Sequence, residues 1–131
     1  MTDIKELQKR IQDLSILIVD DEADLLNGVE KFMKKFFNVV DTALNGEEAL
    51  EKYKQGNYDV IITDIQMPKL SGDKLVKLIK ETNKDIFIGV LTGNLDLDDN
   101  LKKLFDAVLV KPVDMPSLVK LLEKIIEKKG L

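Results

Sequence analysis

Apolar residues in this chain alternate between short continuous runs and longer stretches with helical spacing. The short runs are rich in β-branched residues and indicate buried strands at residues 15–19, 38–43, 58–63, 86–91 and 107–110. The stretches between them predict helices at residues 24–36, after Asn45, at residues 72–81, around residues 101–105 and after Asp114. Five strands therefore alternate with five helices.

Strict alternation of strands and helices is typical of a parallel sheet, because a right-handed crossover must connect each parallel strand to the next. We therefore predict an α/β fold, a doubly wound five-stranded parallel sheet with helices on both faces. The common flavodoxin-like strand order is 2-1-3-4-5. This order opens a crevice at the carboxyl ends of the first and third strands.

An additional helix is predicted before the first strand. Apolar residues recur there at helical intervals, at Ile4, Leu7, Ile11 and Leu14. Asp3 and Glu6 are placed as an N-cap and its partner. Residues 1–14 would then be a helical extension and residues 15–131 one globular domain. Since a helix of about three turns is marginal alone in water, it should pack on its own domain, pair with another copy, or continue a helix of a longer protein.

The composition excludes several classes of chemistry. The chain has 131 residues and contains neither cysteine nor histidine, which excludes disulfides, zinc sites built from these ligands, and Ser/His/Asp or Cys/His catalysis. Its net charge of −4 argues against direct binding to nucleic acid. No apolar run approaches the ~20 residues that span a bilayer, and the N-terminus is too polar for a secretory signal. We expect a cytoplasmic protein without membrane insertion.

Polar residues stand at the ends of four predicted strands. Asp20 and Asp21 follow the first strand, Asp64 the third, Thr92 the fourth and Lys111 the fifth. Alone, each aspartate is better explained as a solvated loop residue. Because the carboxyl ends of parallel strands meet at one edge of a sheet, however, all five side chains should converge.

This combination of side chains suits phosphoryl transfer. Two adjacent carboxylates in a half-buried crevice repel each other unless a cation offsets them, and Mg²⁺, or Mn²⁺, prefers such oxygen ligands. Asp64 could supply both a metal ligand and a nucleophilic oxygen, since carboxylates form aspartyl phosphates. Lys111 and the metal would stabilise charge on the phosphoryl oxygens, and Thr92 could donate its hydroxyl to one of them.

The motifs around these residues resemble the receiver domains of bacterial two-component response regulators, including the chemotaxis regulators. The resemblance runs from about residue 15 to the C-terminus. It comprises the acidic pair in residues 19–22 (VDDE), residues 64–68 (DIQMP) with Gly72 following, residues 91–93 (LTG) and residues 110–112 (VKP). This family has the strand order 2-1-3-4-5, so the predicted topology is not independent of the resemblance.

The resemblance implies that Asp64 accepts a phosphoryl group from a histidine of a partner, either a histidine kinase or a phosphotransfer protein. It implies that Mg²⁺ is held by Asp20 or Asp21, by Asp64 and by the backbone carbonyl of Gln66. Such a domain is no enzyme beyond catalysing its own phosphorylation and dephosphorylation. It switches interactions with a downstream protein.

The resemblance also implies that Thr92 and Lys111 sense the phosphoryl group, and that the Lys111–Pro112 bond is cis, although only roughly 5–6% of X-Pro bonds are cis. Gln66 and Asn94 occupy positions that influence the access of water to the acyl phosphate. The kinase, the downstream target and the choice between monomer and homodimer stay open.

Two departures from the family pattern affect the expected switch. Val108 stands where receivers usually carry an aromatic residue that swings inward. Residues 92–111 are also shorter than usual by about one helical turn. Both departures favour an alternative function, a receiver-like binding module that acts without phosphorylation. Because the chain ends soon after its last helix, we expect a stand-alone regulator or the receiver of a hybrid kinase.

A phosphatase and a flavin-binding module fit the sequence less well. An aspartate-nucleophile phosphatase would carry a second aspartate where Gln66 stands, and would need a cap domain to shape a substrate pocket. A flavin-binding module would need strand-end loops that accept phosphate, whereas the acidic loops of this chain would repel it.

Overall fold

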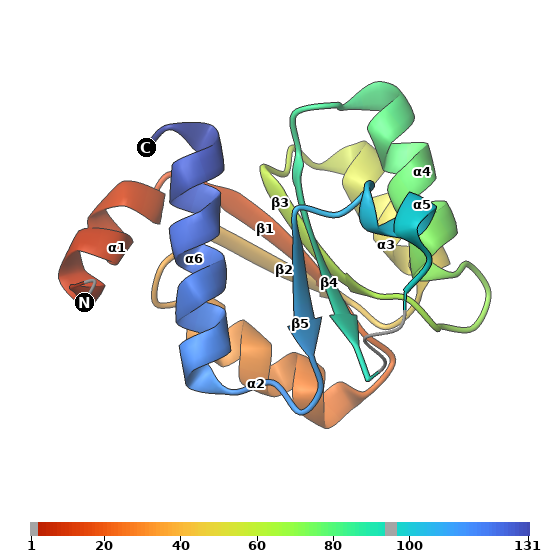
Figure 1. Cartoon of the computed structure of the whole chain (residues 1–131), viewed down its shortest axis with the longest axis horizontal. Helices are drawn as coiled ribbons and strands as arrows, with labels where there is room; N and C mark the ends of the chain where they lie inside the picture. The colour runs from red at the N-terminus through yellow and green to blue at the C-terminus, as the bar shows by residue number, and fades with distance from the viewer. Residues whose placement is uncertain (1–2, 94–96) are drawn as a thin grey trace.

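The sheet is fully parallel and has the predicted strand order. The computed structural model describes residues 3–93 and 97–131. Its strands are β1 (Ser15–Val19), β2 (Val39–Ala43), β3 (Val60–Asp64), β4 (Phe87–Thr92) and β5 (Ala107–Val110). They lie in the order β2-β1-β3-β4-β5, which confirms the predicted doubly wound topology (Figure 1).

Helices cover both faces of the sheet. They are α1 (Ile4–Ile11), α2 (Ala23–Met33), α3 (Gly46–Gln55), α4 (Gly72–Thr82), α5 (Asp99–Lys102) and α6 (Met115–Lys129). Helices α2 and α6 lie on one face, and α3, α4 and α5 lie on the other (Figure 1). Each layer encloses its own apolar core, one including Ile18, Met33 and Leu121 and the other including Ile61, Val76 and Ile79. No helix within these described ranges could cross a membrane.

Two site residues belong to strands and do not follow them, which corrects the predicted boundaries. Asp64 pairs with Leu91 as the last residue of β3, and Thr92 pairs with Val110 as the last residue of β4. Each parallel ladder therefore continues one residue beyond the apolar run. Backbone pairing fixes the main chain of both residues.

Helix α2 ends three residues earlier than its apolar spacing predicted. The N–H groups of Phe36 and Phe37 both donate to the carbonyl of Met33 at 3.0 Å, so the chain tightens into a turn after the helix. This turn buries two consecutive phenylalanines. A regular helix would place consecutive residues on different sides and expose one of them.

The predicted helix caps are largely confirmed. The side chains of Asp3, Asn45 and Asp114 accept hydrogen bonds from the N–H groups of Lys5, Glu48 and Ser117. The expected partnership of Asp3 with Glu6 was wrong, because Glu6 instead accepts from Arg10 Nε at 2.9 Å.

The N-terminal helix α1 packs on its own domain, which was one of the three predicted possibilities. Leu7 and Ile11 are 1% and 0% exposed within the core beneath α6, and α1 lies beside α6 (Figure 1). Arg10 Nη1 donates to the carbonyl of Leu131 at 2.8 Å. The helix thus holds the C-terminus of the chain.

The described part of the segment between β4 and β5 contains the short helix α5. Helix α5 has four residues, and none of them is buried. On β5, Val108 and Val110 are 36% and 39% exposed. Part of the outer strand is therefore uncovered on one face.

Candidate functional site

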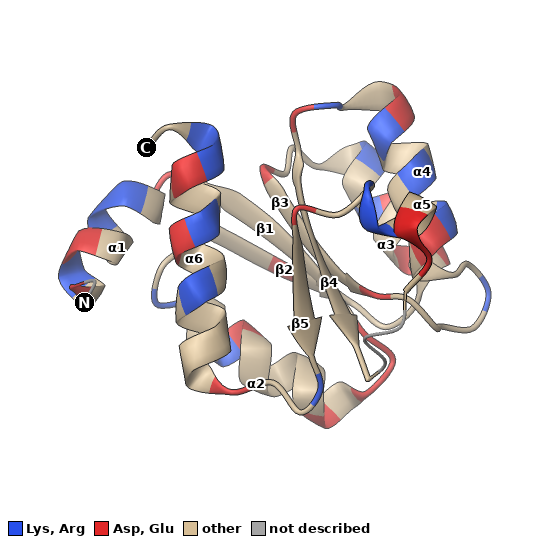
Figure 2. Ribbon diagram, viewed as in Figure 1, with Lys and Arg blue, Asp and Glu red and all other residues tan. Residues whose placement is uncertain are grey.

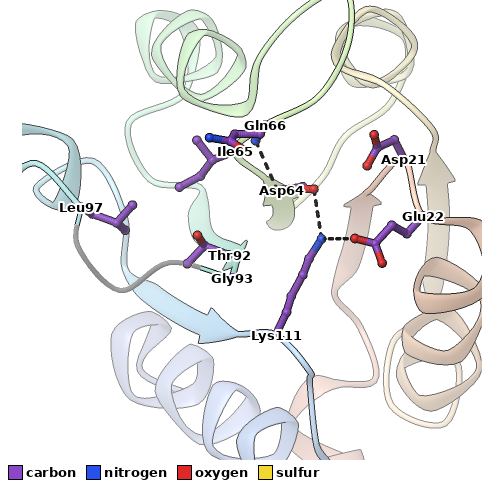
Figure 3. Close-up of a pocket in the computed structure, with 9 residues that line it drawn as sticks. All are labelled: Asp21, Glu22, Asp64, Ile65, Gln66, Thr92, Gly93, Leu97 and Lys111. Atoms are coloured by element: carbon purple, nitrogen blue, oxygen red, sulfur yellow. Dashed lines mark hydrogen bonds and ion pairs between the residues drawn. The ribbon is translucent and has the colours of Figure 1, made fainter.

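A pocket of about 480 Å³ lies at the carboxyl ends of the strands. Its lining residues are Asp21, Glu22, Asp64, Ile65, Gln66, Thr92, Gly93, Leu97 and Lys111 (Figure 3). They come from the ends of β1, β3, β4 and β5 and from the loops that follow. Figure 2 shows acidic segments gathered at this edge of the sheet, with the basic segment that follows β5 among them.

Lys111 is the electrostatic centre of this pocket. Its ammonium lies 3.0 Å from Asp20 Oδ2, 3.0 Å from Glu22 Oε1 and 3.1 Å from Asp64 Oδ2. Burial alone would lower the pKa of Lys111, but the hydrogen bonds to Glu22 and Asp64 and the negative charge of Asp20 outweigh that effect and raise the pKa above its usual value. Lys111 therefore carries a positive charge throughout the neutral range.

Asp20 lies beneath the pocket and is completely buried. Its Oδ1 accepts from the N–H of Glu22 at 2.8 Å, while the contact of Oδ2 with Lys111 lacks hydrogen-bond geometry. Burial raises the pKa of Asp20, against the opposing effects of Glu22 and Lys111. The buried carboxylate is thus only partly satisfied by the protein.

The site has the ligands that a hard divalent cation needs. Carboxylate oxygens of Asp20, Asp21 and Asp64 all lie within 4.8 Å of one another. Together with the partly satisfied Oδ2 of Asp20, this arrangement fits Mg²⁺, which binds carboxylates while keeping several water ligands. Exposed Asp21 and buried Asp20 would approach such an ion from different depths.

Mg²⁺ is expected to raise the melting temperature of the protein. A ligand that binds only the folded state at one hundred times its dissociation constant adds about 2.7 kcal/mol to the free energy of unfolding. Asp21→Asn should remove most of this effect, since it deletes an exposed candidate ligand. Thermal unfolding with and without Mg²⁺ measures the shift. Asp99→Asn, on exposed α5, is the matched control and should keep it; equal shifts in both variants would contradict the site.

Asp64 is held at the centre of the pocket by main-chain and side-chain contacts. Its Oδ1 accepts from the N–H of Gln66 at 3.3 Å, and its Oδ2 accepts from Lys111 at 3.1 Å (Figure 3). The backbone N–H of Lys111 donates to the backbone carbonyl of Thr92 at 2.8 Å. The Lys111–Pro112 bond is cis, as expected.

The predicted site residues come together with two exceptions. Val108 and Pro112 do not line the pocket, and Val108 is among the residues that line a separate groove at β5 and α6. The backbone carbonyl of Gln66 remains a predicted metal ligand. Asn94 lies outside the described residues.

Gly72 is required by the close approach of α4 to the end of β3. A Cβ added to Gly72 would lie 1.9 Å from the carbonyl oxygen of Asp64, and the N–H of Gly72 donates to Ile65 O at 2.7 Å. Any larger residue would push the main chain of Asp64.

Gly72→Ala should therefore destabilise the protein and displace Asp64. Overpacking typically costs about 1–3 kcal/mol, and more when backbone must move. Denaturant unfolding measures the loss. Gly28→Ala is the matched control, because a Cβ there meets nothing within 4 Å and alanine favours a helix over glycine. Equal stability of the two variants would contradict the steric argument.

Glu22 is the functional contact that the sequence reasoning missed. It stands in the acidic run after β1, but it was given no role, although its side chain binds Lys111 at 3.0 Å across 89 residues. A third consecutive acid beside the paired aspartates was the available signal. Sequence spacing alone does not reveal which of these acids reaches Lys111.

Known proteins share both the sequence pattern and the fold. Residues 16–123 match the model of the response regulator receiver domain family. The transcriptional regulatory protein PrrA of Mycobacterium leprae is 31% identical over 118 residues, covering 88% of this chain and 51% of PrrA. The chain therefore spans about half the length of this relative.

Solved structures agree with this match. Response regulator TrrA of Thermotoga maritima, solved in complex with Mg²⁺-BeF, has a TM-score of 0.76 and 35% identity, covering 86% of this chain and 98% of that chain. The co-crystal structure of the Saccharomyces cerevisiae histidine phosphotransfer protein Ypd1 with the receiver domain of the response regulator Ssk1 also matches. The TM-score is 0.80 at 26% identity, and the match covers 92% of this chain and 94% of the matched chain. The chain belongs to the response regulator receiver domain family.

Proposed function

We propose that this chain is a phosphoacceptor receiver and that Asp64 takes the phosphoryl group. The observation that carries the proposal is the position of the Asp64 carboxylate, which lines a pocket with the Lys111 ammonium at 3.1 Å and two further carboxylates within 4.8 Å. Family membership supports it. The partner that supplies the phosphoryl group is a histidine kinase or a histidine phosphotransfer protein, as the Ypd1 complex of Ssk1 suggests by analogy.

The proposed reaction is a transfer between phosphohistidine and aspartate. A carboxylate oxygen of Asp64 forms the new bond to phosphorus as the phosphorus–nitrogen bond breaks, and its electron pair stays on the imidazole nitrogen, which is then protonated from solvent. Lys111 would offset negative charge on the phosphoryl oxygens, and Thr92 would donate its hydroxyl to one of them. Mg²⁺, held by Asp20, Asp21, Asp64 and the carbonyl of Gln66, would neutralise further charge there.

The proposed receiver unit is residues 15–131, with residues 1–14 as an appended helix. The match to the family begins at residue 16, and Leu7 and Ile11 of the appended helix bury against the unit. The chain would catalyse only its own phosphorylation and dephosphorylation. The consequence of phosphorylation would be a population shift at the loops around the pocket, which changes binding to a downstream protein.

The test of this function is the formation of a labile adduct. Incubation with acetyl phosphate and Mg²⁺ should add one phosphoryl group per chain, detected by intact mass, and hydroxylamine should remove it. Excess EDTA should prevent its formation. A chain that stays unmodified under these conditions, although it binds Mg²⁺, would overturn the proposal.

A second candidate function is a binding module that works without phosphorylation. It is favoured by the exposed Val108 in place of an inward-swinging aromatic, and by the four-residue helix α5. NMR spectra with and without beryllofluoride, which mimics the phosphoryl group, distinguish the two functions. Shifts confined to the pocket would support the second function, whereas shifts that extend to β5 and α5 would support the phosphorylation switch.

A further inference from the structure

The side chain of Glu22 is committed to Lys111 and not to its own helix. Glu22 occupies the N-cap position of α2, but it makes no side-chain cap hydrogen bond. Its Oε1 instead binds the ammonium of Lys111 at 3.0 Å (Figure 3). Ser, Thr, Asp and Asn are the side chains that usually cap a helix from this position, whereas the longer side chain of Glu22 contacts a distant strand end.

The Lys111 ammonium is surrounded by carboxylates. It donates hydrogen bonds to Glu22 and Asp64 and forms an ion pair with Asp20 Oδ2 at 3.0 Å that lacks hydrogen-bond geometry. Movement of the ammonium toward a phosphoryl oxygen on Asp64 must weaken at least one of these contacts. The side chain of Glu22 is 62% exposed, whereas those of Asp20 and Asp64 are 0% and 11% exposed. Water replaces the lost contact most readily at Glu22.

We propose that Glu22 is a positioning residue that holds Lys111 in the unphosphorylated arrangement and competes with the phosphoryl group for its ammonium. The inference rests on the proposed function of Asp64. According to this inference, exposed Glu22 at the mouth of the pocket sets the equilibrium between the unphosphorylated and phosphorylated arrangements of Lys111. Weakening the Glu22–Lys111 pair should favour the phosphorylated arrangement.

Two substitutions at Glu22 separate this competition from simple charge repulsion. Glu22→Gln removes the charge. Glu22→Asp keeps the charge, but its side chain is one methylene shorter and can accept from the first turn of α2, so it no longer reaches Lys111. Asp24→Asn is the matched control, since it removes an exposed charge from the first turn of α2 that is not a partner of Lys111.

The test measures the affinity for beryllofluoride, a phosphoryl mimic, by NMR titration of the full chain at saturating Mg²⁺. Exposed ion pairs shift equilibria by roughly two- to fivefold. Both Glu22 variants should therefore bind beryllofluoride about two- to fivefold more tightly than wild type, and Asp24→Asn should match wild type. The rate of phosphorylation by acetyl phosphate should rise by a similar factor.

The affinities of the two Glu22 variants distinguish competition for Lys111 from simple charge repulsion. If Glu22→Asp matches wild type while Glu22→Gln binds more tightly, repulsion explains the effect and the competition is refuted. Wild-type affinity in both Glu22 variants would also refute it. If wild type forms neither the beryllofluoride complex nor the acetyl phosphate adduct, the proposed function fails and this inference falls with it. Thermal unfolding of every variant checks that each is folded.

Discussion

Substitution of Asp64 by asparagine is expected to abolish the phosphoryl adduct while leaving the fold intact. An amide has no anionic oxygen to attack phosphorus, so no aspartyl phosphate can form. In the wild-type structure the backbone N–H of Gln66 donates to Asp64 Oδ1, and the side-chain carbonyl of asparagine can accept the same hydrogen bond. Burial is the main cause of the raised pKa of Asp20, and the charge of Asp64 adds to it, so the substitution relieves some repulsion. It also removes the ion pair between Asp64 and Lys111 at 3.1 Å. Because these two effects oppose each other, the melting temperature without metal should change little.

Intact mass after incubation with acetyl phosphate and Mg²⁺ measures this loss. Asp99→Asn, which removes an exposed charge on α5, is the matched control and should be phosphorylated like wild type. An adduct of undiminished yield on the Asp64→Asn chain would show that another residue accepts the phosphoryl group. The assignment of Asp64 would then be wrong.

Ile11→Ala is expected to lower the free energy of unfolding by about 2–5 kcal/mol, the usual cost of truncating a buried isoleucine. Ile11 is 0% exposed and belongs to the core beneath α6. The loss combines the transfer free energy of the side chain with the cavity left behind. Chemical denaturation of the full chain measures it.

Ile4→Ala is the matched control on the same helix, because Ile4 is 46% exposed and surface substitutions usually stay within about 0.5 kcal/mol. An effect of Ile11→Ala as small as that of the control would show that α1 is detached in solution. Comparing the oligomeric state of the full chain with that of a chain starting at Ser15 separately tests whether α1 mediates dimerisation. An unchanged oligomeric state would dismiss that role.

The fold was predictable because its signals are local. Apolar runs and helical spacing identify elements one at a time, and strict alternation then leaves few topologies. The convergence of Asp20, Asp64 and Lys111 followed from the same rule, since it depends only on which end of each strand a residue occupies. No side-chain geometry was needed for that prediction.

Other features depended on contacts that a local pattern does not contain. The end of α2 is set by the burial of both Phe36 and Phe37 in the assembled core. Glu22 and Lys111 are 89 residues apart in the sequence. Whether Asp21 or Glu22 contacts Lys111 depends on how far each side chain reaches. The docking of α1 stayed undecided because its apolar stripe would fit any of three partners.

The contact of Arg10 with the Leu131 carbonyl joins the last turn of helix α1 to the C-terminus, and both α1 and the C-terminus lie on the side of the sheet away from the carboxyl ends of the strands (Figure 1). A fluorescent tag or a surface tether joined to either end would leave the strand-end crevice accessible from solvent. Immobilised protein can therefore be used to follow acetyl phosphate and beryllofluoride binding.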